Sequence, residues 1–99
     1  MNQPSYRAIA TRQLTYRTKG DSTLKELAVC ISEPRSVSDT STTASCIVSF
    51  DGLPERSDEV TGADSLQALE LAIDAVESHL RRWSKKYDFY IEGDPYFDE

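Results

Sequence analysis

The sequence predicts an α+β domain: an antiparallel sheet of four to five strands with one long helix, from the C-terminal half, packed across one face. Three observations predict this fold class. Residues 66–83 carry apolar side chains at helical spacing, the segments before them alternate as strands do, and their connections are too short for a helical crossover. Because 99 residues have room for one core, we expect a single domain, residues 1–99, with 1–5 and 94–99 frayed or loosely held.

Residues 6–18 are expected to form the first strand. Thr, Tyr and Ile favour extended backbone, and residues 19–22 have the composition of a turn. Ile9 and Leu14 have opposite parity, so one face of a regular strand cannot hold both. Either a bulge interrupts the strand or its pairing begins late.

Three more segments before the helix are expected to be strands. Residues 24–33 form the second, which ends at Pro34 because proline has no N–H to donate. Residues 44–50 form the third, and the Asp51-Gly52 turn leads into a short fourth strand at 56–61. The side chains expected to face the core are Leu27, Val29, Ile31, Cys46, Val48 and Phe50.

The helix is expected to begin at Asp64 or Ser65. Asp64 as N-cap with Gln67 three residues later resembles a capping box. Its apolar stripe, spaced by three and four residues, consists of Leu66, Leu69, Ile73, Val76, Leu80 and Trp83. This spacing also suits a coiled coil, but it is short and a sheet is available to cover it. Residues 87–91 follow as a last strand.

The charge is unevenly distributed along the chain. The formal net charge is −6: residues 1–50 hold six basic and four acidic residues, and residues 51–99 hold five basic and thirteen acidic ones. This balance argues against direct nucleic-acid binding and against an anionic membrane surface. No apolar run is long enough to span a bilayer and no signal peptide follows Met1, so we expect a cytoplasmic protein.

The residues suited to catalysis or metal binding are few and scattered. Cys30 and Cys46 are expected on opposite faces of neighbouring strands, so they should remain reduced thiols. His79, the single histidine, falls beside the apolar stripe and is expected to be a boundary residue. The tail acids are expected to be solvated, without a metal: Asp94, Asp98 and Glu99. With no nucleophile motif and no phosphate-binding loop, we expect a protein that is not an enzyme and takes no cofactor.

The other face of the second and third strands is expected to carry small, half-polar side chains. These are Ala28, Cys30, Ser32, Ser45, Ile47 and Ser49. This face is expected either to be lightly exposed or to be covered by the aromatic tail, a different protein or a second copy of the chain. A homodimer through Ala28, Cys30 and Ile47 is therefore one alternative.

The run Gly62-x-Asp64-Ser65-Leu66-Gln67-Ala68-Leu69-x-Leu71-Ala72, after a strand containing Cys46, resembles a family of small bacterial proteins known as a domain of unknown function. The opening segment from Ile9 to Leu14 fits the same pattern. The resemblance covers about residues 8–83 and implies a single α+β domain in a bacterial setting. It implies no activity, ligand or catalytic residue.

The leading functional hypothesis is a non-enzymatic acidic binding protein. Its most concrete form is an immunity or inhibitor protein that blocks a basic protein partner such as a bacterial toxin, with carboxylates for steering and aromatic residues as anchors. The residues expected to bind this partner are Asp51, Glu55, Asp58, Glu59, Tyr96, Phe97 and Asp98. The alternatives are the homodimeric subunit and a DNA mimic that inhibits a nucleic-acid-binding protein.

Overall fold

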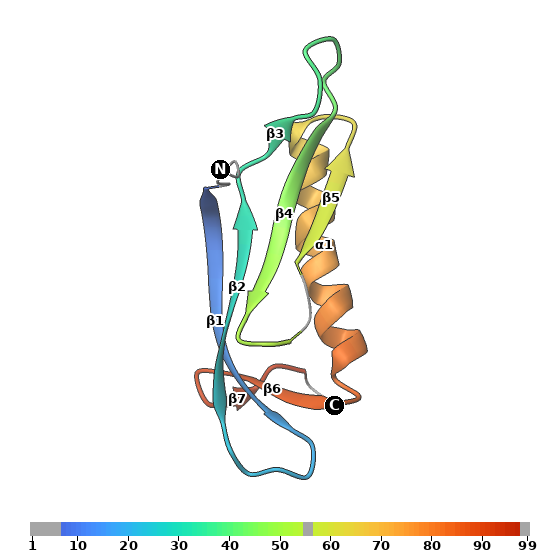
Figure 1. The fold of residues 1–99 in the computed structure, drawn as a ribbon. Helices are drawn as coiled ribbons and strands as arrows, with labels where there is room; N and C mark the ends of the chain where they lie inside the picture. The colour runs from blue at the N-terminus through green and yellow to red at the C-terminus, as the bar shows by residue number, and fades with distance from the viewer. Residues whose placement is uncertain (1–6, 55–56, 98–99) are drawn as a thin grey trace.

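The computed structural model describes residues 7–54 and 57–97 as one sheet and one helix (Figure 1). The strands are β1 (Ala8–Thr18), β2 (Lys25–Ser32), β3 (Arg35–Ser36), β4 (Ala44–Asp51), β5 (Asp58–Gly62), β6 (Tyr87–Ile91) and β7 (Asp94–Pro95), and the helix is α1 (Ser65–Trp83). The α+β class is confirmed, but the sheet has seven strands instead of four to five. The two that the sequence did not predict, β3 and β7, have two residues each, too few to produce a visible alternation.

The strands follow the order β3-β4-β2-β1-β6-β7, and β5 pairs with β4 as well. Every ladder between these strands is antiparallel. β1 pairs with β2 along its length, with a register shift between Ala8 and Ala10. The opposite parity of Ile9 and Leu14 predicted either such an irregularity or late pairing. The shift does not bring both side chains into the core, because Leu14 is buried and Ile9 is exposed.

The helix begins as its sequence predicts. Asp64 is the N-cap with extended backbone, and its Oδ1 accepts a 2.8 Å hydrogen bond from the Gln67 N–H. Gln67 reaches back, and its Oε1 accepts from the Ala63 N–H at 2.7 Å. The Gln67 N–H, which the first turn leaves without a helical partner, is thereby satisfied, and so is the N–H of Ala63 just before the N-cap. At the other end, Arg81 and Arg82 lie in the last turn, where cations offset the helix dipole.

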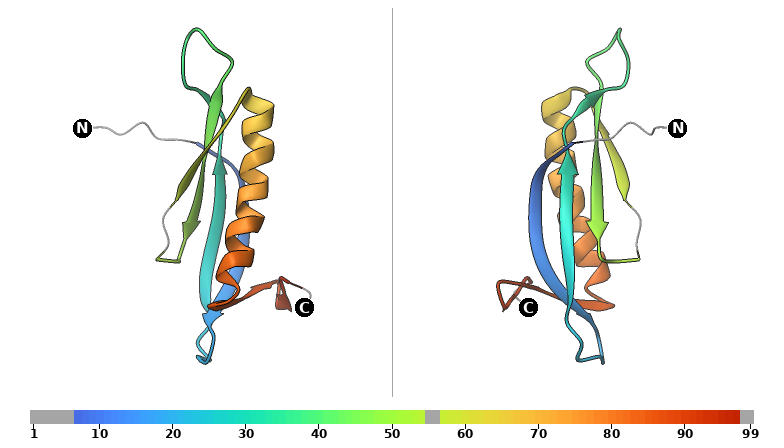
Figure 2. Two further views of the ribbon diagram at one scale, coloured as in Figure 1. Left: turned by 90° about the vertical axis from the view of Figure 1, so that its right-hand side faces the viewer. Right: turned by 60° about the vertical axis from the view of Figure 1, so that its left-hand side comes forward.

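α1 lies on one face of the sheet, over β4 and β5, and the two form two packed layers (Figures 1 and 2). Towards its C-terminal end the helix approaches the segment of the sheet that contains β6 (Figure 1). The buried core lies between the layers: Leu14, Tyr16, Leu27, Val29, Ile31, Ala44, Cys46, Val48, Phe50, Leu53, Ala68, Ala72, Val76, Leu80, Tyr87 and Phe89. All the strand side chains that the sequence assigned to the core are among them.

The buried face of α1 differs from the predicted stripe. Ala68, Ala72, Val76 and Leu80 are buried, whereas Leu66 is 67% exposed and Ile73 is 53% exposed. The assignment of Leu66 and Ile73 to the core was therefore wrong. The reason is the close approach of the helix to β5, which only small side chains permit: a Cβ added to Gly62 would lie 2.4 Å from the backbone nitrogen of Ala68. The alanines turn inward, and the larger side chains beside them turn outward.

The two cysteines are free and lie on opposite faces of the sheet, as parity predicted. Cys46 faces the helix and is fully buried, and burial raises the pKa of its thiol. Cys30 is half-buried on the other face, where its sulfur accepts a hydrogen bond from the Thr11 hydroxyl at 3.7 Å.

Candidate functional site

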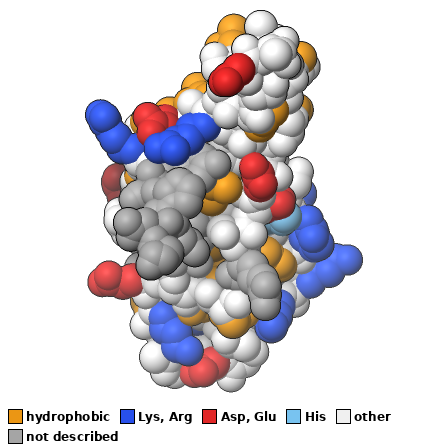
Figure 3. Space-filling view, turned by 45° about the horizontal axis from the view of Figure 1, so that its top comes forward, with side chains coloured by type: hydrophobic (Ala, Val, Ile, Leu, Met, Phe, Trp, Pro, Cys, Tyr) orange, Lys and Arg blue, Asp and Glu red, His pale blue; other side chains and the backbone are white. Residues whose placement is uncertain are grey.

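The acidic residues predicted to bind a partner do not form one surface. Asp58 and Glu59 are consecutive in β5 and therefore point to opposite faces. Asp58 lies 3.0 Å from Nε2 of His79 on the helix side, whereas Glu59 accepts a 3.0 Å hydrogen bond from Ser45 on the other side. Asp51 is exposed at the end of β4, and Glu55 lies outside the described residues. In Figure 3 the acidic side chains are scattered over the visible face among basic and uncharged ones.

The two described aromatic residues of the tail are held against the rest of the chain. The Tyr96 N–H donates to the Phe89 carbonyl at 2.8 Å, and the guanidinium of Arg81 lies 4.5 Å from the centre of the Phe97 ring. Both side chains are partly buried against the core. Asp98 lies outside the described residues. Tyr96 and Phe97 are therefore engaged within the molecule, and the tail segment 94–97 has defined neighbours.

The sheet face proposed for a homodimer carries the predicted small side chains. Ala28, Cys30 and Ile47 are half-buried there. Ser32 is buried, and its Oγ accepts a 2.8 Å hydrogen bond from the Ile47 N–H. Among the described residues no helix covers this face (Figure 2).

The open edge of β1 is the feature that distinguishes this sheet. β6 pairs with β1 only from Thr15 to Thr18, and no described strand pairs with that edge from Ala8 to Leu14. The six residues from Ala8 to Gln13 are all exposed. β5 also has an open edge, but it is five residues long and bears two carboxylates, which discourage pairing.

The backbone groups on this edge point outward. The Lys19 N–H donates to the Lys86 carbonyl at 3.0 Å, so Lys19 directs its peptide groups away from β2. In a regular strand the N–H and C=O groups of every second residue point to the same edge, and the pairing of β1 with β2 is regular back to Ala10. Thr11 and Gln13 therefore direct their N–H and C=O groups to the open edge, where an added strand would find them.

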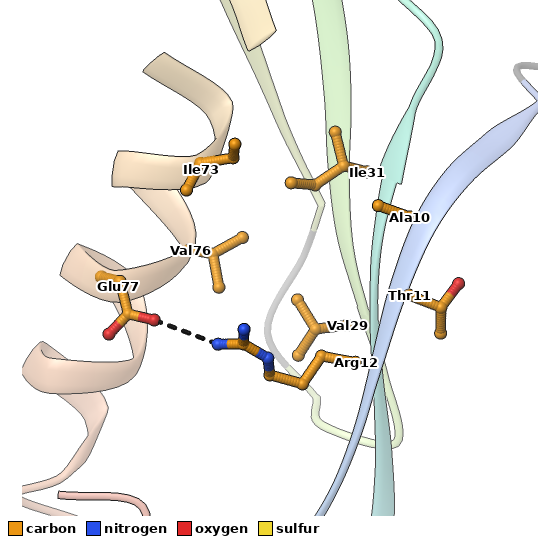
Figure 4. A pocket seen from close by; sticks show the side chains of 8 residues that line it. All are labelled: Ala10, Thr11, Arg12, Val29, Ile31, Ile73, Val76 and Glu77. Atoms are coloured by element: carbon orange, nitrogen blue, oxygen red, sulfur yellow. Dashed lines mark hydrogen bonds and ion pairs between the residues drawn. The ribbon is translucent and has the colours of Figure 1, made fainter. Parts of the chain in front are cut away.

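An apolar groove lies beside this edge, between β1 and α1 (Figure 4). Its volume is about 240 Å³. We call it the β1–α1 groove; it is lined by Ala10, Thr11, Arg12, Val29, Ile31, Ile73, Val76 and Glu77. Ile73 and Val76 point from the helix towards Ile31 and Val29 on the sheet, and the Thr11 side chain points away (Figure 4). The groove exists because α1 covers β4 and β5 and leaves the first half of β1 uncovered.

A cluster of three polar side chains spans one end of the groove. Nη1 of Arg12 donates to the Tyr96 hydroxyl at 2.5 Å and lies 3.4 Å from Oε2 of Glu77. The Tyr96 hydroxyl in turn donates to the same Glu77 oxygen. Arg12 and Glu77 are both about half exposed, so their ion pair contributes little to stability by itself. Its effect is geometric: it fixes the Arg12 side chain across the groove.

The Tyr96 phenol gives this cluster a testable dependence on pH. Burial raises the pKa of Tyr96 above its ordinary value of 10.0, and the hydrogen bond to Glu77 raises it further. As the pH rises past about 10, the unfolded chain loses this proton first, so folding stability falls. We therefore expect the stability advantage of the wild type over Tyr96→Phe to be constant below about pH 9 and to shrink above about pH 10.

Urea unfolding of both proteins between about pH 8 and pH 11 measures this difference. The subtraction removes the titration of the other tyrosines and the lysines, which both proteins share. A parallel loss of stability in the two proteins would show that Tyr96 makes no such contribution.

A second hollow, of about 350 Å³, lies beside β6. Its cations are already engaged: Nζ of Lys19 lies 2.6 Å from Asp88, and Nε of Arg17 lies 3.4 Å from the same carboxylate. The hydrogen bond from Lys19 is the main cause that lowers the pKa of Asp88. This hollow therefore offers no cation that lacks a carboxylate partner.

The described residues include no group of three or more metal-binding side chains. His79 is a boundary residue that stacks on Trp83, with ring centres 5.2 Å apart, while its Nδ1 lies 3.0 Å from Nη2 of Arg82. No helix in residues 7–54 and 57–97 has the length and apolar character needed to cross a bilayer.

Comparison with known families gives one match. The model of a family described as a domain of unknown function, DUF6968, matches residues 10–92. The chain belongs to this family. No curated protein and no solved structure matches the chain. The matched segment begins within β1 and ends after β6, so it contains every residue that lines the β1–α1 groove. The membership agrees with the expected resemblance to a family of unknown function.

Sequence reasoning did not single out the open edge or the groove. One signal for the open edge was the opposite parity of Ile9 and Leu14. It predicted an irregularity in the part of β1 that β6 does not pair with. The second signal was the wide apolar face of the helix, which holds the stripe as well as Ala68 and Ala72. One sheet cannot cover all of it.

Proposed function

We propose that this protein is a non-enzymatic binding protein that receives an extended segment of another protein as an added strand on β1. The observation that supports the proposal is the open edge from Ala8 to Leu14 next to the β1–α1 groove. In strand addition, backbone hydrogen bonds supply affinity, and pockets for alternate side chains supply specificity. This edge and groove have both elements, in residues that the rest of the described chain does not use.

A proline at Thr11 tests this proposal. The Thr11 N–H points to the open edge, so Thr11→Pro removes a donor from that edge and none from the β2 ladder. The matched control, Thr11→Val, retains the N–H and a β-branched side chain. The probe is a phage library of random heptapeptides selected on the wild-type protein. We expect the selected peptides to bind Thr11→Val as tightly as the wild type and Thr11→Pro at least about tenfold more weakly.

The outcome is informative in either direction. Unfolding curves of the two variants first show that both are folded. Equal binding of the selected peptides by Thr11→Pro and wild type would place their site elsewhere. A selection that enriches no peptide over an unrelated control protein would contradict the proposal.

The identity of the partner is a separate proposal, which rests on composition. An immunity or inhibitor role against a basic toxin in a bacterial cytoplasm is motivated by the net charge of −6 and by the absence of recognised catalytic motifs. Charge reversal at Asp51 and Glu59 tests this role, because both are exposed and lie away from the groove. The homodimer and the DNA mimic remain predictions from sequence, tested by sedimentation of Ile47→Arg and by competition with DNA.

A further inference from the structure

The two ends of the β1–α1 groove differ in chemistry. At one end Ala10 is small and exposed, and the side chains around it are apolar: Ile31, Ile73 and Val76. At the other end the guanidinium of Arg12 crosses towards Glu77 (Figure 4). Ile73 is 53% exposed, so it has apolar surface left to bury. The Ala10 end therefore presents apolar surface that a large apolar side chain of a partner can bury.

The register of an added strand determines which of its side chains meet these two ends. Side chains of paired residues point to the same face of a sheet. Residues opposite Ala10 and Arg12 therefore project into the groove, and those opposite Thr11 and Gln13 project to the other face. In an antiparallel strand, as in every ladder of this sheet, the residue opposite Arg12 precedes the residue opposite Ala10 by two positions.

The charge beside the edge favours a carboxylate opposite Arg12. β1 has no acidic residue, Arg7 immediately precedes it, and Glu77 is the one acidic residue in the groove lining. The open half of β1 thus carries one basic and no acidic side chain in a protein whose net charge is −6, and Glu77 on the helix is the carboxylate that faces it. An acidic side chain opposite Arg12 forms an ion pair with its guanidinium, whereas a basic side chain there is repelled by it.

A second copy of the chain does not have this chemistry. If two β1 strands pair with Thr11 at the centre, Ala10 of one copy faces Arg12 of the other, which places a cation at the apolar end. The neighbouring registers set Arg12 against Arg12 or Ala10 against Ala10. The first opposes two like charges, and the second leaves the apolar end unfilled. The edge is therefore suited to a segment of different sequence.

We propose that the groove selects an antiparallel segment of a partner protein with an acidic residue two positions before a large apolar one, bound beside Arg12 and Ala10 respectively. This inference rests on the proposed strand addition and names the sequence that it selects. The apolar side chain packs over Ala10 against Ile73, and the carboxylate shares the guanidinium with Glu77.

Three synthetic peptides with blocked ends test this sequence preference. The first is Thr-Thr-Glu-Thr-Leu-Thr-Thr, in which Glu is set opposite Arg12 and Leu opposite Ala10. The second exchanges Glu and Leu and so keeps the composition, and the third replaces Leu by Ala. NMR titration of the isotope-labelled protein follows the amide signals of Thr11 and Gln13. We expect the first peptide to bind about tenfold or more tightly than the other two, with shifts at both amides.

The substitution Ala10→Leu, which fills the apolar end of the groove, separates the sequence preference from strand addition itself. Ala10 is exposed, so Ala10→Leu is expected to fold, to bind the three peptides with equal weak affinity and to retain their shifts at Thr11 and Gln13. Equal binding of the peptides by the wild type overturns the sequence preference and leaves strand addition intact. If none of the three peptides shifts the Thr11 and Gln13 signals up to millimolar concentration, the sequence preference is also overturned. Strand addition is tested separately: it fails if Thr11→Pro binds the library-selected peptides as tightly as the wild type does.

Discussion

Replacement of Gly62 by alanine is expected to lower the free energy of unfolding by about 2–4 kcal/mol. Gly62 ends β5 immediately before the helix, and an added Cβ would lie 2.4 Å from the nitrogen and 2.9 Å from the Cα of Ala68. Both are backbone atoms in the first turns of α1, so no side-chain rotation relieves the clash. The helix must move away from the sheet, which loosens the packing of Ala68 and Ala72.

Thermal or urea unfolding of Gly62→Ala measures this loss, which corresponds to a fall in Tm of at least about 10 °C for a domain of this size. Gly20→Ala is the matched control. Gly20 has a φ of +87°, but no heavy atom lies within 4 Å of its Cβ position, so alanine there adds about 1 kcal/mol of backbone strain and no clash. Similar losses in the two variants would mean that the close approach of helix and strand at Gly62 does not limit stability.

Leu80→Ala is expected to cost about 3 kcal/mol, whereas Leu66→Ala is expected to change stability by less than about 0.5 kcal/mol. Leu80 is fully buried under the C-terminal half of α1, and truncation leaves a cavity there. Leu66, on the same helix, is 67% exposed, and alanine has the higher helix propensity.

Urea unfolding of these two variants tests the orientation of the helix directly. The predicted stripe places Leu66 and Leu80 on one buried face and so requires comparable losses. The structure requires a difference of at least about 2 kcal/mol between them. Comparable losses would show that the helix is turned towards the stripe instead of towards the alanines.

The fold was largely predictable from local patterns, and the candidate site was not. The alternation of Leu27, Val29 and Ile31 and the capping pair of Asp64 and Gln67 act over a few residues, so sequence alone reveals them. The rotation of α1 depends on how closely Ala68 approaches Gly62, which is a contact between two layers. Periodicity indicates that a face is apolar, but it does not specify which part of a wide face the sheet covers.

The open edge was beyond sequence reasoning for a similar physical reason. The pairing of β1 with β6 stops at Thr15, which leaves the edge of β1 that faces away from β2 open at Thr11. Where it stops is a matter of register between strands about seventy residues apart. For the acidic residues, the sequence predicted a cluster that the structure does not contain. Asp58 and Glu59 are adjacent in the sequence, but a strand sends them to opposite faces, so a cluster in sequence is not a cluster in space.

The position of β1 between β2 and β6 has a consequence for protein synthesis. Tyr16 packs edge-on against Tyr87, with ring centres 5.3 Å apart, so β1 completes its packing only after β6 has been synthesised. Until then the nascent chain exposes Tyr16 and an additional length of unpaired edge on β1. Such surfaces promote association between unfinished chains. We therefore expect truncation before β6 to yield a product that aggregates or is degraded, although it contains most of the sheet and the whole helix.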